Sequence, residues 1–160
     1  MENIKVVIIM GSKSDLAVME EAAKVLKDFG VLYEMKVLSA HRTPEETAQY
    51  AQGLKGRGVQ AVICGAGMSA ALSGVVAAHT TLPVIGVPLE ASSLDGIDAL
   101  LSTVMMPPGV PVGAVAIGIP GAKNAAYLAL RIMGVTDKDI EGKLEDFRKE
   151  QARKILDIKL

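Results

Sequence analysis

The chain contains little of several residue types on which whole classes of protein depend. Cys64 is the single cysteine, which excludes an internal disulfide framework and a thiolate metal cluster. There is no tryptophan, there are three tyrosines and two phenylalanines, and the net charge is −1. Nucleic-acid binding by base stacking or through a basic surface therefore has no support.

Long hydrophobic runs are missing as well. The residues are 50% hydrophobic, yet no apolar run reaches the ~18 residues that a membrane span needs. The first residues lead directly into a strand pattern and show no signal peptide. We therefore expect one domain with a substantial core, located in the cytoplasm and without a membrane partner.

The sequence does contain a regular alternation of strand and helix patterns. Apolar stretches predict strands at about 4–10, 33–38, 59–65, 84–88 and 112–117. Helical patterns follow them at about 13–29, 44–56, 69–79, 94–103 and 121–133. This alternation predicts a single three-layer α/β domain over 1–160, with a parallel five-stranded sheet and flavodoxin-like architecture.

A last helix is predicted at about 137–158. It is charged, with apolar residues at helical spacing: Ile140, Leu144, Phe147, Ile155 and Ile158. Because it follows a complete α/β unit, its apolar face must cover the sheet or pack on another subunit. The generous hydrophobic content favours packing on another subunit.

The stretch Ser39–Pro44 has the clearest chemical content. Thr43–Glu46 has the pattern of a capping box with proline at the first helical position. His41 and Arg42 therefore lie between the carboxyl end of a strand and a helix, the edge at which open α/β sheets bind ligands. A histidine can transfer protons near neutral pH, and an arginine can hold a phosphate or a carboxylate.

The turn after the first strand has two interpretations. Ser12 and Asp15 have the spacing of a capping box, so the turn can simply be the start of a well-capped helix. The same helix start can also bind an anion through free N–H groups and the helix dipole. Asp15 suits ribose hydroxyls better than a phosphate.

The loop after the third strand has a pattern associated with dinucleotides. Gly65–Ala70 matches G-x-G-x-x-A, and Glu90 lies 20 residues beyond Ala70. The motif follows the third strand, and no second domain remains to hold a substrate, so NAD binding is disfavoured. The plainer interpretation is that small residues allow a ligand or another subunit to approach closely.

Two further residues receive structural interpretations. His79 lies near a helix end, where it suits the C-terminal dipole rather than chemistry. Cys64 ends a buried strand and is expected to be a small core residue rather than a nucleophile.

Five blocks of the chain occur in one order in a known family: Gly11–Asp15, Ser39–Pro44, Pro83–Pro88, Met106–Val112 and Asn124–Ala126. Together they resemble the PurE family of purine biosynthesis, with N5-carboxyaminoimidazole ribonucleotide mutase activity, and the similarity extends from residue 5 to about 150. The resemblance implies a flavodoxin-like subunit, a homo-octamer with active sites between subunits, and neither a metal nor an organic cofactor.

The resemblance also implies residue roles. His41 is the expected acid and base, while Ser12, Asp15 and Arg42 are expected to bind a ribonucleotide substrate. Neighbouring positions complete the expected substrate site: Gly11, Ser39, Gly67 and Ser69.

The mutase reaction requires a group that transfers protons and a pocket that excludes water. It releases CO2 from a carbamate nitrogen and attaches it to a ring carbon, for which one histidine can both donate and remove the proton. Holding CO2 requires a pocket poor in water, and the small-residue loop 66–74 and the segment 106–111 are candidate walls.

Some positions depart from the mutase pattern. Ala71 and Ser73 stand where the bacterial mutases carry a histidine and a proline, and Met105 replaces a glutamine. The loop resembles instead the animal-type branch, which carboxylates aminoimidazole ribonucleotide directly with CO2. Arg42–Pro44 and Gly86–Pro88 follow the mutase pattern, so a mutase is favoured and direct carboxylation is the alternative.

A non-catalytic nucleotide-binding domain also stays open. A phospho-acceptor receiver domain would need acidic residues at the first and third strand ends, where Met10 and Gly65 stand.

Overall fold

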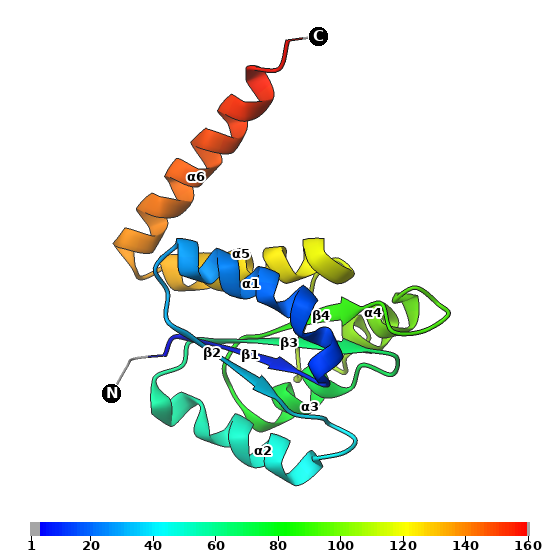
Figure 1. Cartoon of the computed structure of the whole chain (residues 1–160). Helices are drawn as coiled ribbons and strands as arrows, with labels where there is room; N and C mark the ends of the chain where they lie inside the picture. The colour runs from blue at the N-terminus through cyan, green and yellow to red at the C-terminus, as the bar shows by residue number, and fades with distance from the viewer. Residues whose placement is uncertain (1–3, 160) are drawn as a thin grey trace.

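The computed structural model describes residues 4–159. Within this range one parallel sheet has the strand order β2-β1-β3-β4-β5 (Figure 1). Its strands are β1 (Val6–Met10), β2 (Tyr33–Val37), β3 (Ala61–Gly67), β4 (Val84–Leu89) and β5 (Gly113–Ala114). This order is that of the flavodoxin-like doubly wound sheet, so the predicted architecture is confirmed.

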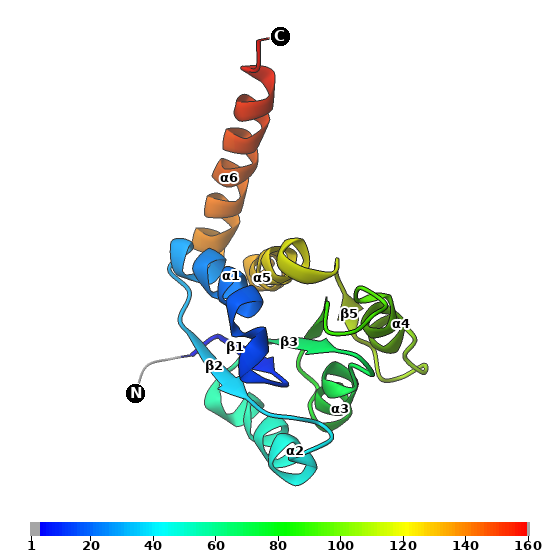
Figure 2. The ribbon, with the colours of Figure 1, turned by 45° about the vertical axis from the view of Figure 1, so that its right-hand side comes forward.

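Helices cover both faces of the sheet. They are α1 (Leu16–Asp28), α2 (Pro44–Gly53), α3 (Leu72–His79), α4 (Ile97–Val104), α5 (Gly118–Gly134) and α6 (Lys138–Leu156), with short 3-10 turns η1 (Lys13–Asp15) and η2 (Lys55–Arg57). Figure 2 shows α1 and α5 on one side of the sheet and α2 and α3 on the other. The result is a three-layer sandwich.

The central strand β1 shows why the sequence folds this way. All five of its residues are buried. Val6, Ile8 and Met10 pack in the core beneath α1 and α5, while Val7 and Ile9 pack in the core beneath α2 and α3. A strand buried on both faces is apolar throughout, as a parallel sheet requires.

Several element boundaries differ from the sequence prediction by three residues, among them the starts of α1, α3, α4 and α5, and β5 is shorter than expected. The strand expected at 112–117 forms ladder pairs with β4 at Gly113 and Ala114, and the Val115 N–H still donates to the Gly86 carbonyl at 3.2 Å. The helix α5 then begins at Gly118 rather than near 121. Pro120 suits the first turn of that helix, because the missing N–H has no partner there in any case. The helix expected from 69 begins at Leu72, because the positive φ angles of Met68 and Ala70 do not fit an α-helix.

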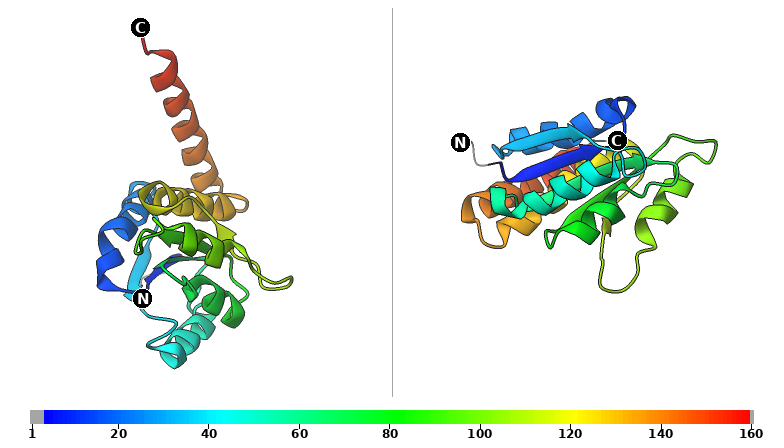
Figure 3. Two further views of the ribbon diagram at one scale, coloured as in Figure 1. Left: turned by 90° about the vertical axis from the view of Figure 1, so that its right-hand side faces the viewer. Right: turned by 90° about the horizontal axis from the view of Figure 1, so that it is seen from below.

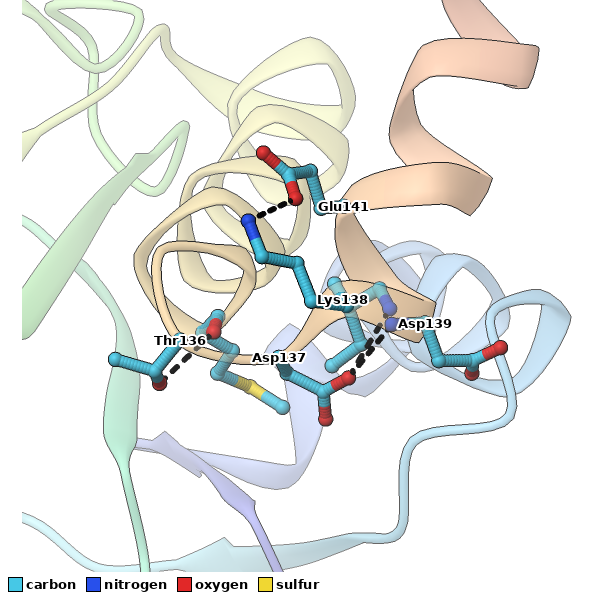
Figure 4. Close-up of polar contacts among 7 residues, drawn as sticks. Thr136, Asp137, Lys138, Asp139 and Glu141 are labelled. Carbon is cyan, nitrogen blue, oxygen red and sulfur yellow. Dashed lines mark hydrogen bonds and ion pairs between the residues drawn. The ribbon is translucent and has the colours of Figure 1, made fainter.

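The final helix α6 projects away from the domain instead of covering the sheet (Figures 1 and 3). Its start is fixed by Asp137, whose carboxylate accepts hydrogen bonds from the N–H groups of Asp139 and Ile140 at 3.0 and 3.2 Å (Figure 4). Ile140 is buried, and Phe147 stacks on Tyr127 with ring centroids 4.8 Å apart. Only the first half of α6 therefore contacts the domain.

Close backbone packing at the start of α5 gives a test of the fold. A Cβ on Gly121 would lie 1.6 Å from the backbone oxygen of Ala116, and a backbone atom has little freedom to move away. We expect Gly121→Ala to lower the free energy of unfolding by about 3 kcal/mol or more, measured by urea denaturation.

The matched control is Gly142→Ala in α6. A Cβ there meets nothing within 4 Å among the described residues, so alanine should be neutral or stabilise the helix by about 0.5–1 kcal/mol. Equal unfolding midpoints for the two variants would show that the Ala116 backbone oxygen does not lie close to Gly121.

Candidate active site

A pocket of about 550 Å³ opens at the carboxyl ends of β1, β2 and β3. Its walls are the turns that follow β1 and β2, the end of β3 with the loop up to Leu72, and Ala91, the second residue after β4. All eight residues that the sequence assigns to the site line this one pocket: Gly11, Ser12, Asp15, Ser39, His41, Arg42, Gly67 and Ser69.

The turn after β1 is built around Ser12 and Asp15. The Ser12 Oγ accepts a hydrogen bond from the Ser14 N–H at 3.3 Å, and the Ser12 N–H donates to Asp15 Oδ2 at 3.0 Å. The predicted capping box is therefore confirmed. Burial raises the pKa of the Asp15 carboxyl above its ordinary value, while the Ser12 N–H and the nearby Arg42 charge offset part of the rise.

The turn after β2 presents His41 and Arg42. Both are exposed at the pocket. Arg42 donates from Nη2 to the Gly11 carbonyl at 3.0 Å and from Nε to Ser39 Oγ at 3.4 Å, which ties the β2 turn to the β1 turn. A guanidinium has five N–H donors, so these two contacts leave donors for an anionic ligand.

The capping box predicted at Thr43–Glu46 does not form among the described residues. Pro44 does occupy the first turn of α2, but the Thr43 side chain makes no capping hydrogen bond to that helix. Its hydroxyl instead accepts from the Ser39 N–H at 2.9 Å and donates to the Ser39 carbonyl at 3.0 Å. The Thr43 hydroxyl therefore bonds to the turn that precedes α2 and does not cap the helix.

The end of β3 and the loop after it are shaped by close contacts and by one backbone hydrogen bond, from the Ala70 N–H to the Gly67 carbonyl at 3.0 Å. A Cβ on Gly65 would lie 2.3 Å from the Met19 sulfur, and one on Gly67 would lie 2.4 Å from the Ala91 Cβ. The glycines thus let β3 end close to α1 and to the chain after β4. Since α3 starts beyond the motif, at Leu72, the glycines do not open a helix as a dinucleotide fingerprint requires.

Other candidate residues lie elsewhere. His79 ends α3, with Nδ1 3.5 Å from Gln52 Nε2, and within the described chain it does not line the pocket. Cys64 is buried in the core, which raises the pKa of its thiol. Among the described residues the segment 106–111 does not line the pocket either; its first residue, Met106, lies beside Gly74 of α3. The expected apolar wall is thus not supplied by this segment within one chain.

The sequence interpretation overlooked several pocket residues. Ser14, Ala40 and Ala91 line the pocket without having been assigned to it, whereas Met68 and Ala70 belong to the loop 66–74 that was expected as a wall. Ala91 follows the carboxyl end of β4, so strand topology alone could have placed it at this edge.

Comparison with known proteins gives the family. A family model described as AIR carboxylase matches residues 5–154. The chain belongs to the AIR carboxylase family.

Two relatives are both named N5-carboxyaminoimidazole ribonucleotide mutase. The one from Pyrococcus abyssi is 57% identical over 93% of this chain and 84% of its own length, and the one from Saccharolobus solfataricus is 51% identical over 98% of each.

A solved structure agrees with the AIR carboxylase family assignment. Treponema denticola PurE has a TM-score of 0.85 and 35% identity, and the match covers 94% of this chain and 93% of that one. The resemblance inferred from the five sequence blocks is thereby confirmed. No helix in residues 4–159 is long and apolar enough to span a membrane.

The contact between Gly67 and Ala91 can be tested by a double-mutant cycle. Gly67→Ala should lower the free energy of unfolding by about 1–3 kcal/mol, because its Cβ has no room beside Ala91. Ala91→Gly removes the obstructing atom, so the double variant should recover part of the loss. The four unfolding curves measure the coupling, and strictly additive effects would contradict the contact.

Proposed function

We propose that this protein is an N5-carboxyaminoimidazole ribonucleotide mutase of purine biosynthesis, acting in the cytoplasm. The observation that carries the proposal is the meeting of His41, Arg42 and Asp15 in one pocket of a chain whose relatives carry that name. The reaction moves a carboxyl group from the exocyclic nitrogen of the substrate to its ring carbon.

Substrate binding follows from the charges around the pocket. The Arg42 guanidinium is the donor for the ribose phosphate. Asp15 accepts hydrogen bonds from the ribose hydroxyls. The guanidinium is held by Gly11 and Ser39, so it loses little freedom when the phosphate binds.

His41 is the proposed acid and base. In the first step the bond between nitrogen and carboxyl carbon breaks, CO2 leaves, and His41 protonates the nitrogen. In the second step the ring carbon attacks the CO2 and His41 removes the ring proton, which restores its own protonation state. The apolar side chains of Ala66, Ala70 and Leu72 line the pocket and disfavour water around the CO2.

Direct carboxylation of aminoimidazole ribonucleotide is the second candidate. Ala71 lines the pocket at the position where the bacterial mutases carry a histidine, so the pocket lacks that second imidazole. With free CO2 as substrate, only the second step is needed, and His41 alone can serve it.

Turnover of two substrates separates these reactions. The purified protein receives either N5-carboxyaminoimidazole ribonucleotide or aminoimidazole ribonucleotide with abundant CO2, and formation of the ring-carboxylated product is followed. We expect efficient turnover of the first substrate. Efficient turnover of the second alone would establish the carboxylase, and turnover of neither would favour a nucleotide-binding domain.

Histidine variants test the assigned acid and base. His41→Asn should lower kcat by about 10²-fold or more while nucleotide binding stays detectable by calorimetry. His79→Asn, which changes the same residue type outside the pocket, should keep the parent rate. A His41→Asn protein with parental activity would remove His41 from the mechanism.

We also propose a homo-octamer in which α6 packs on another subunit. The apolar stripe of α6 continues beyond its contacts with the domain: Ile155 in its last turn is 69% exposed, and Ile158, two residues after the helix ends, is 61% exposed. Exposed apolar side chains in a row are typical of a subunit interface.

Charge placed on this stripe tests the assembly. Ile155→Glu should shift the octamer towards smaller species in sedimentation velocity, because the carboxylate would be buried in the interface. Arg153→Glu is the control, since it lies about 200° around the same helix, on the polar face. An unchanged octamer in both variants would mean that this end of α6 stays outside any interface.

A further inference from the structure

The turn that carries His41 and Arg42 is closed by a hydroxyl group. Thr43 Oγ1 accepts from the Ser39 N–H at 2.9 Å and donates to the Ser39 carbonyl oxygen at 3.0 Å. The Thr43 N–H donates to the same carbonyl at 2.8 Å. These bonds join Ser39 to Thr43, and His41 lies midway between them.

From Ser39 the network extends to the guanidinium. Ser39 Oγ accepts from the Arg42 N–H at 3.2 Å and from Arg42 Nε at 3.4 Å. Arg42 Nη2 then reaches the Gly11 carbonyl at 3.0 Å. The direction of the guanidinium therefore depends on the position of Ser39, and Thr43 holds that position.

Thr43 is itself anchored by helix α2. Thr47 is fully buried, and its Oγ1 and N–H both donate to the Thr43 carbonyl, at 2.7 and 3.0 Å. The first turn of α2 thus supports the turn 39–43 from below. A helix anchored through its buried residue Thr47 gives this support a rigidity that an exposed loop lacks.

We propose that Thr43 is a positioning residue for the reaction. This inference rests on the proposed function. The hydroxyl fixes the turn so that the His41 ring faces the reacting nitrogen and carbon while Arg42 faces the phosphate. Valine has nearly the same shape but neither donates nor accepts, so in Thr43→Val the part-buried Ser39 N–H loses its partner.

Two substitutions at this position separate the hydroxyl from the methyl group. Thr43→Val should lower kcat/KM by about 10- to 100-fold, since a displacement of ~1 Å at a reacting group has an effect of that size. The loss should appear in kcat through His41 and in KM through Arg42. Thr43→Ser restores the hydroxyl and should return to within about threefold of the parent, because the same hydrogen bonds can form.

Thr103→Val is the matched control. Thr103 is 2% exposed, and its Oγ1 donates to the Ala99 carbonyl at 2.8 Å inside α4, a helix with no pocket residue in the described part of the chain. This variant also loses a buried hydroxyl, yet kcat/KM should stay at the parent value. Thermal unfolding of all the variants is measured in parallel.

Several outcomes would overturn the inference. They are parental kcat/KM in Thr43→Val, an equal loss in Thr43→Ser, or an equal loss in Thr103→Val. If the parent turned over neither substrate, the proposed function would fail instead. Titration of the parent and of Thr43→Val with aminoimidazole ribonucleotide would then still test whether Thr43 positions Arg42 for the phosphate. An unchanged Kd would overturn that part of the inference.

Discussion

The pocket depends on a single constraint, the common level at which β1 and β2 end beside Gly65 of β3, which itself continues to Gly67. Met10, the last residue of β1, is paired with Val37 of β2 on one side and with Gly65 of β3 on the other. Two hydrogen bonds continue this pairing past the strands, from the Leu38 N–H to the Met10 carbonyl and from the Gly11 N–H to the Gly65 carbonyl. Residues far apart in the sequence therefore leave the sheet side by side, and the polar side chains of their turns share one volume.

The charges in this volume explain why the pocket suits a nucleotide. Arg42 and Asp15 carry opposite charges from adjacent turns, so each can contact a different part of one ligand. Burial disfavours the charged form of Asp15, and the Ser12 N–H stabilises that form in return. The carboxylate is thus held by its own turn and does not need to pair directly with Arg42, which stays free for an anion.

The sequence predicts what depends on local chemistry and on sheet topology. Residue types and spacing predict the apolar run of β1 and the capping box at Ser12. The rule that ligands bind at strand ends predicts that His41 and Arg42 lie at the pocket. Features that depend on competition between contacts could not be predicted. Thr43 has the pattern of a helix cap, but its hydroxyl binds the upstream turn, and only the folded positions of Ser39 and α2 decide between these partners.

The loop before α3 and the final helix α6 also depend on contacts that the local sequence does not predict. Met68 and Ala70 adopt positive φ angles that their residue types disfavour, so the later start of α3 has no local signal. The amphipathic pattern of α6 predicts a covered face but not its direction. That direction follows from contacts distant in sequence, such as the 3.2 Å hydrogen bond from Lys143 Nζ to the Phe29 carbonyl.

The two sides of the pocket are held by different forces, and this difference bears on how one fold could support two related reactions. The turn 39–43 is fixed by directional hydrogen bonds, so few side chains can replace those it has. The loop 67–71 has no side-chain hydrogen bond among the described residues; close contacts of small residues and one backbone hydrogen bond, from the Ala70 N–H to the Gly67 carbonyl, hold it. Its left-handed Met68 and Ala70 store about 1–3 kcal/mol each. A change of side chain at Ala71 alters the lining of the pocket without breaking any hydrogen bond of the turn that holds His41. The turn that carries His41 can therefore keep its hydrogen bonds while the lining of the opposite wall varies.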